Sequence, residues 1–368
     1  MILVKAKRND MLGPLSAVSG IIERRHTLPI LSNVLLDPAG GRLSYLATDI
    51  EIQIGARTDL EALEEAKAVT VGARKLVDIL RALPEASEVT LSMQDRRLQI
   101  KAGRSRFTLQ TLPAEDFPRL AKPAGDTAGF ALPQRALRRL LGLVQYAMAQ
   151  QDIRYYLNGL LMVVEDNQLK LVATDGHRLA FASMALPADL PRQEVILPRK
   201  SVLELSKLLG DGDGDVKVEV SANQVGFSFG AIELVSKLVD GKFPDYTRVI
   251  PKEHKNRVQV EREVLRQALQ RAAILSNEKF RGVRWVLTDN SLKIVSSNAE
   301  QEEANEELEV VYAGDSLDIG FNVTYLLDVL NNVEGSMVEA NFGDAASSTL
   351  ISVPGEKDFK YVVMPMRI

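Results

Sequence analysis

The chain has 368 residues, of which 46% are hydrophobic, with a formal net charge of −4 and no cysteine. This composition is typical of a globular protein with two or three domains, and it excludes disulfides, thiolate metal sites and cysteine nucleophiles while fitting a reducing cytoplasm. No run of about 18 apolar residues occurs, so no membrane span is expected. Residues 1–7 are expected to form a strand rather than a secretion signal.

One long pattern occurs three times along the chain. Thr48-Asp49 follows an apolar run, recurs 126 residues later as Thr174-Asp175, and recurs a further 123 residues on as Ser297-Asn298. Repeats longer than about 50 residues are whole domains rather than solenoid units. We therefore expect three domains, called below the first (residues 1–125), middle (126–254) and third (255–368) repeat. Their boundaries fall in stretches rich in proline, glycine and charge.

In chain order, each repeat is expected to contain a strand, a helix, several strands, a second helix and several more strands. Helices are predicted from apolar residues three or four positions apart, as at Leu76, Leu80 and Leu83. The predicted helices include residues 75–83, the stripe Leu137, Leu140, Leu141 and Val144, the stripe Val264, Leu265, Ala268, Leu269 and Ala272, and residues 325–332.

Alternation of apolar and polar residues predicts strands at residues 88–93, 98–102 and 215–220. Opening strands are expected to begin at Ile2, Phe130 and Val258. Most spacings between strands are too short for parallel crossover connections. The predicted class is α+β, with antiparallel sheets covered by two helices in each domain.

Basic residues lie opposite the apolar stripes of several predicted helices. Arg74 and Arg81 are repeated 126 residues later by Lys200 and Lys207. For any one helix, an ordinary solvent-exposed face would explain these basic residues. Their recurrence at the same repeat offset favours a surface that faces nucleic-acid phosphates without recognising base sequence. The third repeat has Thr324 and Asn331 at the matching places, so its contribution should be weaker. Further members of the basic set are Arg135, Arg138, Arg139, Arg262 and Arg266.

Several kinds of chemistry are absent from the sequence. There is no phosphate-binding loop or dinucleotide fingerprint, and the three histidines (His26, His177 and His254) are too scattered for a typical zinc site. Residues 211–215 lack the glycine and glutamate that a calcium loop requires. Asp175 and His177 could form an acid–base pair of a hydrolase, but no nucleophile accompanies them, so a turn with a binding role is favoured. We predict no catalytic residue, metal or cofactor.

The acidic run at residues 300–307 has two interpretations. It is either a solvated face or a docking surface for the basic segment at residues 103–107.

Longer stretches resemble a known family. The chain is similar to the bacterial beta sliding clamp, the processivity subunit of DNA polymerase III holoenzyme, across all three repeats. The matching stretches are residues 27–33, 103–107, 154–159, 173–179, 236–246, 273–283 and 361–368.

The resemblance implies a head-to-tail homodimer ring of six similar domains, with pseudo-sixfold symmetry and helices around a central hole. In the family, the first domain of one subunit meets the third domain of the other. An apolar centre flanked by opposite charges would give such an interface both affinity and register. The corresponding residues are Lys75, Arg104, Arg106, Phe107, Ile274, Leu275, Glu300, Glu302, Glu303 and Glu306.

The family also has one partner-binding groove in each subunit, between its second and third domains. Met, Pro and Leu side chains would make an adaptable trough for short peptides, although the Met-Pro-Met tail could instead be a packed terminus. Ala345 and Ala346 stand where the family often has a larger apolar residue. The carried-over groove residues are Leu157, Thr174, Gly176, His177, Arg178, Leu179, Pro244, Arg248, Val249, Asn322, Tyr325, Ala346, Ser348, Val362, Met364, Pro365, Met366 and Arg367.

For DNA, the family contacts correspond to Arg25 (or Arg24 in the neighbouring register), Gln151, Tyr155, Tyr156, Arg199 and Lys200. These join the helix residues Arg74, Arg81, Arg135, Arg138, Arg139 and Lys207. The implied function is a non-enzymatic DNA sliding clamp in the bacterial cytoplasm, associated with the nucleoid. Its expected partners are a second copy, duplex DNA of any sequence, a clamp loader, and the polymerase III alpha subunit or other polymerases and repair proteins. The alternative is a peptide-binding scaffold of the same fold in DNA repair or replication control.

Overall fold

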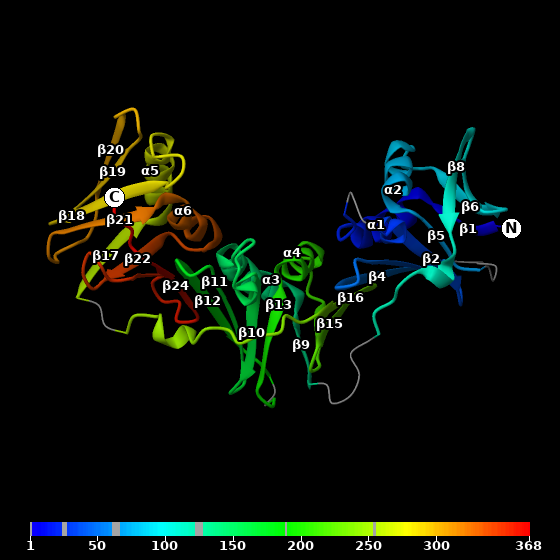
Figure 1. The fold of residues 1–368 in the computed structure, drawn as a ribbon, viewed down its shortest axis with the longest axis horizontal. Coiled ribbons are helices and arrows are strands. Elements are labelled where there is room, and N and C mark those ends of the chain that lie inside the picture. The colour runs from blue at the N-terminus through cyan, green and yellow to red at the C-terminus, as the bar shows by residue number, and fades with distance from the viewer. Residues whose placement is uncertain (1, 24–27, 61–66, 122–127, 188–189, 253–254) are drawn as a thin grey trace. The chain divides into compact units, whose positions relative to one another are not determined.

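The computed structural model describes residues 2–23, 28–60, 67–121, 128–187, 190–252 and 255–368 (Figure 1). It contains two compact units. Unit 1 consists of Met1–Leu137 and Leu203–Leu238, and unit 2 consists of Arg138–Val202 and Val239–Ile368. The division passes through the middle repeat. The domain boundaries expected from the sequence, at 125/126 and 254/255, fall within or beside residues that lie outside the described ranges.

The first repeat begins with a strand that leads directly into a helix. Its elements are β1 (Ile2–Lys7), α1 (Arg8–Ser19), β2 (Asn33–Ala39), β3 (Arg42–Thr48), β4 (Ile52–Asp59), β5 (Val69–Gly72), α2 (Ala73–Ala82), β6 (Glu88–Gln94), β7 (Arg97–Ala102) and β8 (Ser105–Leu112).

The middle repeat follows the same order. Its elements are β9 (Ala128–Pro133), α3 (Gln134–Val144), β10 (Gly159–Glu165), β11 (Gln168–Thr174), β12 (Arg178–Ala185), β13 (Gln193–Pro198), α4 (Arg199–Leu208), β14 (Asp215–Val220), β15 (Gln224–Phe229) and β16 (Ile232–Lys237).

The third repeat has the same order of elements. Its elements are β17 (Asn256–Glu261), α5 (Arg262–Ile274), β18 (Gly282–Thr288), β19 (Ser291–Ser297), β20 (Glu303–Glu309), β21 (Leu317–Asn322), α6 (Val323–Asn332), β22 (Met337–Phe342), β23 (Thr349–Ser352) and β24 (Phe359–Val363).

This shared order confirms the threefold repeat and the α+β class. Each repeat has one strand, a helix, four strands, a helix and three strands, and the strand pairings in the described residues are antiparallel. The predicted helices at 75–83 and 325–332 each begin two residues earlier, at Ala73 and Val323. The predicted strand at 215–220 coincides with β14.

The strands of every repeat form two sets of four. In the first repeat the sets are β1-β6-β7-β8 and β5-β2-β3-β4, and the other two repeats follow the same scheme. Sets from successive repeats then join edge to edge. Strand β4 pairs with β16 in unit 1, which we call the first joint, and β12 pairs with β24 in unit 2, which we call the second joint. These joints explain why the compact units do not coincide with the repeats.

Two strands that occupy joint positions have an open edge. Strand β20 is the fourth strand of the third repeat and pairs only with β19 among the described residues. Strand β8 is the last strand of the first repeat; it pairs with β7 along its length but with β5 only at Thr111 and Leu112. An unpaired strand edge presents backbone donors and acceptors to any matching edge.

In the first and third repeats, the first residue of the first helix caps the second helix. Arg8 Nε donates to the Leu80 carbonyl over 2.8 Å, and Arg262 Nη1 donates to the Leu330 carbonyl over 2.8 Å. Cations at a helix C-terminus satisfy its last carbonyls and favour its dipole. Arg262, expected in a solvent-facing basic set, is half-buried and also donates to the Gly335 carbonyl over 2.9 Å. Arg266, in the same set, pairs with Glu263 one turn earlier at 2.5 Å.

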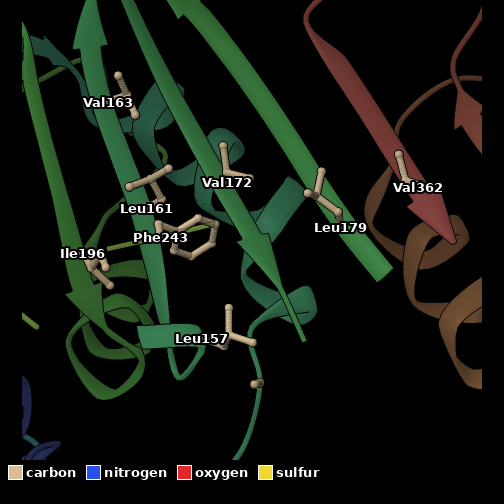
Figure 2. Close-up of a cluster of buried hydrophobic side chains, with 9 residues drawn as sticks. Leu157, Leu161, Val163, Val172, Leu179, Ile196, Phe243 and Val362 are labelled. Carbon is tan, nitrogen blue, oxygen red and sulfur yellow. The ribbon is translucent and has the colours of Figure 1, made fainter. Parts of the chain in front are cut away.

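The core of unit 2 beside the second joint is a cluster of aliphatic side chains from the sheet, with Phe243 packed against them (Figure 2). Leu161, Val172, Leu179 and Val362 come from neighbouring strands, and each is at most 2% exposed. Successive strands place alternate residues on this one face, and Phe243 covers that face from the segment after β16.

Candidate functional site

A tight turn connects β11 to β12 and shapes one side of a cavity in unit 2. Thr174 Oγ1 donates to the Arg178 carbonyl over 2.6 Å, while Asp175 Oδ1 accepts from the backbone N–H groups of His177 and Arg178. Gly176 lies inside the turn with φ +88°, a left-handed conformation that glycine adopts without a steric penalty. Short polar side chains that bond to nearby backbone are the usual way to fix such turns.

The cavity beside this turn has a volume of about 190 Å³ and a predominantly apolar lining. Strand β12 supplies Leu179, β24 supplies Val362, and the segment after β24 supplies Met364. An apolar recess with a few polar groups at its rim is the usual form of a ligand site. The full lining is Arg154, Leu157, Thr174, Gly176, His177, Arg178, Leu179, Phe243, Pro244, Tyr246, Val249, Val362 and Met364.

Arg178 anchors the cavity wall through a network of charge and aromatic contacts. Its side chain is 9% exposed and contacts Asp175 Oδ2 at 3.1 Å and Asp328 Oδ2 at 2.5 Å. Nη2 donates to the Tyr146 carbonyl over 2.6 Å, and the guanidinium lies 4.4 Å from the ring centroid of Tyr325. A buried guanidinium with several acceptors is held in one orientation.

The pKa values in this network follow from burial and charge. Burial lowers the pKa of Arg178, but Tyr361 and the Asp328 hydrogen bond outweigh it, so the pKa lies above its usual value. Burial raises the pKa of Tyr361 and of Tyr146. Arg178 therefore stays a cation, and both tyrosines stay neutral, at physiological pH.

Arg154 forms the other side of the cavity mouth. Its Nη2 donates to Asp152 Oδ2 over 2.8 Å and to the Asp175 carbonyl over 3.3 Å. The hydrogen bond from Arg154 lowers the pKa of Asp152 to about 2, so this pair persists through the physiological range. A Cβ at Gly176 would lie 2.9 Å from Arg154 Nη2, so glycine also permits this close approach.

Ten of the eighteen predicted groove residues line the cavity, and the others lie outside its wall. Tyr325 packs on Arg178 instead, Asn322 caps α6 through Thr324, and Arg248 is an exposed partner of Asp245. Ala346 and Ser348 lie between β22 and β23, with Ala346 exposed. Pro365, Met366 and Arg367 continue beyond Met364, where the Met366 N–H donates to the Gly320 carbonyl.

Three cavity residues were missed from the sequence: Arg154, Phe243 and Tyr246. A signal for Phe243 was available, because Phe117-Pro118 and Phe243-Pro244 stand 126 residues apart and both phenylalanines are buried. No comparable repeat marks Arg154 or Tyr246.

The geometry of Asp175 fits a turn rather than an acid–base pair. One carboxylate oxygen accepts from two backbone N–H groups, and the other accepts from Arg178 Nε. The same turn occurs in the first repeat, where Asp49 Oδ1 accepts from Glu51 and Ile52. The carboxylate of Asp175 is thus occupied in holding the backbone.

The predicted DNA-facing helix residues are solvent-accessible, but several have partners. Arg74 and Arg81 are exposed on α2, and Arg135 is exposed on α3. Arg139 pairs with Glu356 at 3.2 Å and Glu334 at 3.5 Å, while Lys207 pairs with Glu204 at 2.7 Å. Arg138 is exposed and Lys200 is half-buried.

The loop before β10 holds Gln151, Tyr155 and Tyr156, whereas Arg199 begins α4, and Arg25 lies outside the described residues. Gln151 is exposed with φ +56°, and Tyr155 and Tyr156 contact edge to face at 5.8 Å. Arg199 is half-buried and donates to the Met148 carbonyl over 3.1 Å, so it supports this loop.

The predicted interface residues lie in two places. Lys75, Arg104 and Arg106 are exposed on α2 and around the start of β8 in unit 1, with Phe107 half-buried. In unit 2, Ile274 is 76% exposed at the end of α5, beside the half-buried Leu275. Glu300 and Glu302 are exposed just before β20 and Glu303 is exposed at its start, whereas Glu306 pairs with Arg271 at 2.6 Å.

Within the described ranges, no helix is long and apolar enough to cross a membrane. The same part of the chain holds no group of three or more His, Cys, Asp or Glu residues that could bind a metal ion.

Comparison with known proteins assigns each repeat to a domain of one family. Residues 3–121, 131–245 and 247–367 match the N-terminal, central and C-terminal domains of the DNA polymerase III beta subunit. The chain belongs to the DNA polymerase III beta subunit family.

Similarity to members of this family extends over the whole chain. A beta sliding clamp of Pseudomonas putida is 49% identical over 98% of this chain and 99% of its own, and that of Escherichia coli K12 is 47% identical with the same coverage. A crystal structure of the Pseudomonas aeruginosa sliding clamp bound to griselimycin superposes with a TM-score of 0.96, at 47% identity and full coverage of both chains. A Caulobacter crescentus beta sliding clamp, 38% identical, gives a TM-score of 0.94 over 100% of this chain and 99% of its own.

Proposed function

We propose that this chain is a DNA sliding clamp in which two copies close head to tail into a ring around duplex DNA. Membership of the DNA polymerase III beta subunit family supports this function, and the open sheet edges support the ring. The cavity of unit 2 is proposed as the groove that holds peptides of polymerases and repair proteins.

The observation that carries the ring is the repeated joint. The fourth strand of the first repeat pairs with the last strand of the middle one, and the fourth strand of the middle repeat pairs with the last strand of the third. The same rule leaves β20 to pair with β8, and a second copy of the chain, placed head to tail, can supply this partner for each strand. A heterologous contact of this kind forms a closed ring when its rotation closes.

The register of such a pairing can be derived from the first joint. There, Ile232 at the start of β16 lies opposite Ala56 of β4. Ser105 begins β8 as Ile232 begins β16, and Glu306 lies opposite Ile294 as Ala56 lies opposite Tyr45. A ring joint built in this way sets Ser105 opposite Glu306 of the other copy.

Charge and apolar area support this pairing. Arg104 and Arg106 would approach the acidic start of β20, and Phe107 and Ile274 would contribute apolar surface. Complementary charge sets register and steers association, whereas buried apolar area supplies affinity.

The basic helix residues are proposed to face DNA. A ring needs only weak attraction to phosphates, because it cannot leave closed DNA without opening, and contacts without base readout permit sliding. This is how a chain with net charge −4 can act on DNA. We infer that it is non-catalytic, that a separate clamp loader opens the ring, and that it works in the cytoplasm at the nucleoid.

The decisive experiment compares DNA of two shapes. The protein is loaded onto nicked circular plasmid with a matched clamp loader and ATP, half of the sample is linearised, and both are gel-filtered in high salt. Retention on circles with loss from linear DNA is expected. Equal retention on both shapes would contradict topological binding.

Charge reversal separates the clamp from a peptide-binding scaffold of the same fold. The variant Arg74→Glu, Arg81→Glu, Lys200→Glu, Lys207→Glu is expected to lose DNA retention while keeping peptide affinity in the groove. If the protein is instead a peptide-binding scaffold, the same variant should still support the activity of its partners although it no longer stays on DNA. A replication assay on a primed circular template measures that activity.

A further inference from the structure

A second cavity, of about 500 Å³, lies at the first joint in unit 1. Its apolar wall includes Leu35 of β2 and Leu46 of β3. Three arginines from separate segments also line it: Arg42 of β3, Arg57 of β4, and Arg119 after β8. The ten groove residues described above belong to unit 2, so this cavity is a different site.

Gly55 lines the cavity at the position that an aromatic residue occupies in the second joint. Gly55 lies opposite Glu233 in the first joint, just as Phe181 lies opposite Lys360 in the second. At the second joint Tyr246 stacks on Phe181, with ring centroids 5.9 Å apart and planes at 29°. Gly55 provides no ring for such a stack.

The backbone at Gly55 does not require glycine. Its φ is not in the left-handed region, and a Cβ there would meet Leu46 Cδ1 at 3.5 Å, an ordinary contact. A larger side chain would therefore fit into the cavity without strain in the strand, and the open volume is a property of this sequence rather than of the fold.

The charges of this cavity are also particular to the first joint. The residues that match Arg42 and Arg57 at the second joint, 126 positions on, are Gln168 and Ser183. Arg119 contacts Asp37 at 3.9 Å and Arg42 contacts Asp59 at 4.0 Å, both at the outer limit of an ion pair. Each guanidinium has five donors, so donors remain for another anion.

We propose that this cavity is a second binding site, which takes a peptide segment carrying one carboxylate beside an apolar side chain. The lining holds three arginines against the carboxylates of Asp37 and Glu233. With Asp59, which pairs with Arg42 from outside the lining, three carboxylates balance the three arginines, so the cavity suits a single carboxylate better than a chain of phosphates. Arginine forks bind carboxylate through paired hydrogen bonds, and Leu35 and Leu46 offer an apolar surface for the neighbouring side chain.

The test uses the full-length protein and a matched pair of probes. The hexapeptide Gly-Ser-Leu-Glu-Gly-Ser and its counterpart with Gln in place of Glu, both amidated at the C-terminus and labelled at the N-terminus with an uncharged BODIPY dye, are titrated by fluorescence polarisation. The Glu peptide is expected to bind one site per chain at least about tenfold more tightly than the Gln peptide, since hydrogen bonds to a charged group contribute roughly 1.5–3 kcal/mol.

Two variants locate the site. Gly55→Phe fills the cavity as Phe181 does at the second joint, and Arg57→Gln removes one guanidinium without adding bulk. Each is expected to weaken the Glu peptide about tenfold or more. The control Arg97→Gln makes the same charge change on an exposed position of β7 and should leave the affinity unchanged. Thermal unfolding establishes that the variants are folded.

The results of this test distinguish binding in the first-joint cavity from binding in the groove of unit 2. Equal binding of the Glu and Gln peptides, or Glu-peptide binding that survives both Gly55→Phe and Arg57→Gln, would overturn the proposal. Displacement of the probe by a groove peptide would show that the probe binds in unit 2, and this result would also overturn the proposal. A phosphoserine counterpart that binds far more tightly would show a phosphate site instead, so the assignment to carboxylates would be wrong.

Discussion

At the first joint the Lys237 N–H donates to the Glu51 carbonyl over 2.9 Å, and at the second the Met364 N–H donates to the His177 carbonyl over the same distance. The backbones match, but the side chains differ. Lys237 and Glu51 form an ion pair at 3.1 Å, whereas Met364 and His177 line a cavity. One scaffold therefore carries a charged bridge in one place and an apolar recess in another.

The neighbouring residues extend this contrast. Gln53 occupies the position of Leu179, and its Oε1 accepts from the Leu120 N–H over 2.8 Å, which ties the following segment to the sheet. Ile52 occupies the position of Arg178 and is buried. The different lining of the two joints is thus explained by a few side chains rather than by a difference in fold.

The largest effect is expected from breaking the polar network of the second joint. Arg178→Ala would remove a buried guanidinium and leave Asp175 and the half-buried Asp328 without it, and breaking a buried ion pair in this way typically costs about 3–5 kcal/mol in the free energy of unfolding. Urea unfolding monitored by circular dichroism would measure it. The control Arg248→Ala breaks an exposed pair with Asp245 and should cost under about 1 kcal/mol. Equal losses for both variants would contradict the role of Arg178.

Two substitutions can give the groove of the second joint the ion pair that the first joint has. His177→Glu with Met364→Lys would place an ion pair where the cavity opens. Affinity for the clamp-binding peptide of the cognate polymerase should fall roughly tenfold to a hundredfold, because a charged bridge replaces apolar contacts worth about 1.5–3 kcal/mol. Calorimetric titration measures this. Unchanged peptide affinity in a folded double variant would refute the assignment of the groove.

Alkaline pH should affect the two units unequally. Burial raises the pKa of Tyr45 in unit 1, and of Tyr146 and Tyr361 in unit 2, above the ordinary value of 10.0. Stability from these groups is complete below pH 10 and is lost as pH rises further, because the unfolded chain releases the protons first. The loss is about 1.4 kcal/mol per pH unit for each tyrosine.

Unit 2, with two of these tyrosines, should therefore lose stability faster than unit 1 between pH 10 and pH 11. Hydrogen exchange followed by mass spectrometry would resolve the units. Faster loss of protection in unit 1 would argue against this account.

The smallest effect concerns the turns. Ile50 has φ +72° at the place where Gly176 has φ +88°. A left-handed conformation costs a residue other than glycine about 1–2 kcal/mol, and glycine loses roughly 0.5–1 kcal/mol through chain entropy. Ile50→Gly should stabilise unit 1 slightly, and Gly176→Ile should destabilise unit 2, both measured by urea unfolding. Changes of the same sign would exclude this explanation.

Local patterns predicted the elements well, and they failed where contacts are distant in sequence. The stripe of Leu76, Leu80 and Leu83 indicated α2, and the alternation at residues 215–220 indicated β14. Nothing local indicates that Gly55 pairs with Glu233, because edge-to-edge pairing depends on the completed sheets.

The predicted groove came from family resemblance rather than from spacing. Its members on the turn and on β12 line the cavity, because a tight turn fixes them locally. The members beyond Met364 do not, and the network of Arg178 with Asp328 could not be foreseen, since it joins residues 150 positions apart.

The pairing of β12 with the C-terminal strand has a consequence for synthesis on the ribosome. Arg178 can pair only after its partner in the register, Val363, has been synthesised, which is about 185 residues later. At roughly 5–20 residues per second, the wait is about 10–40 s. During this interval the edge of β12 is open and the cavity wall lacks Val362, so the nascent chain completes this wall only after β24 has been synthesised.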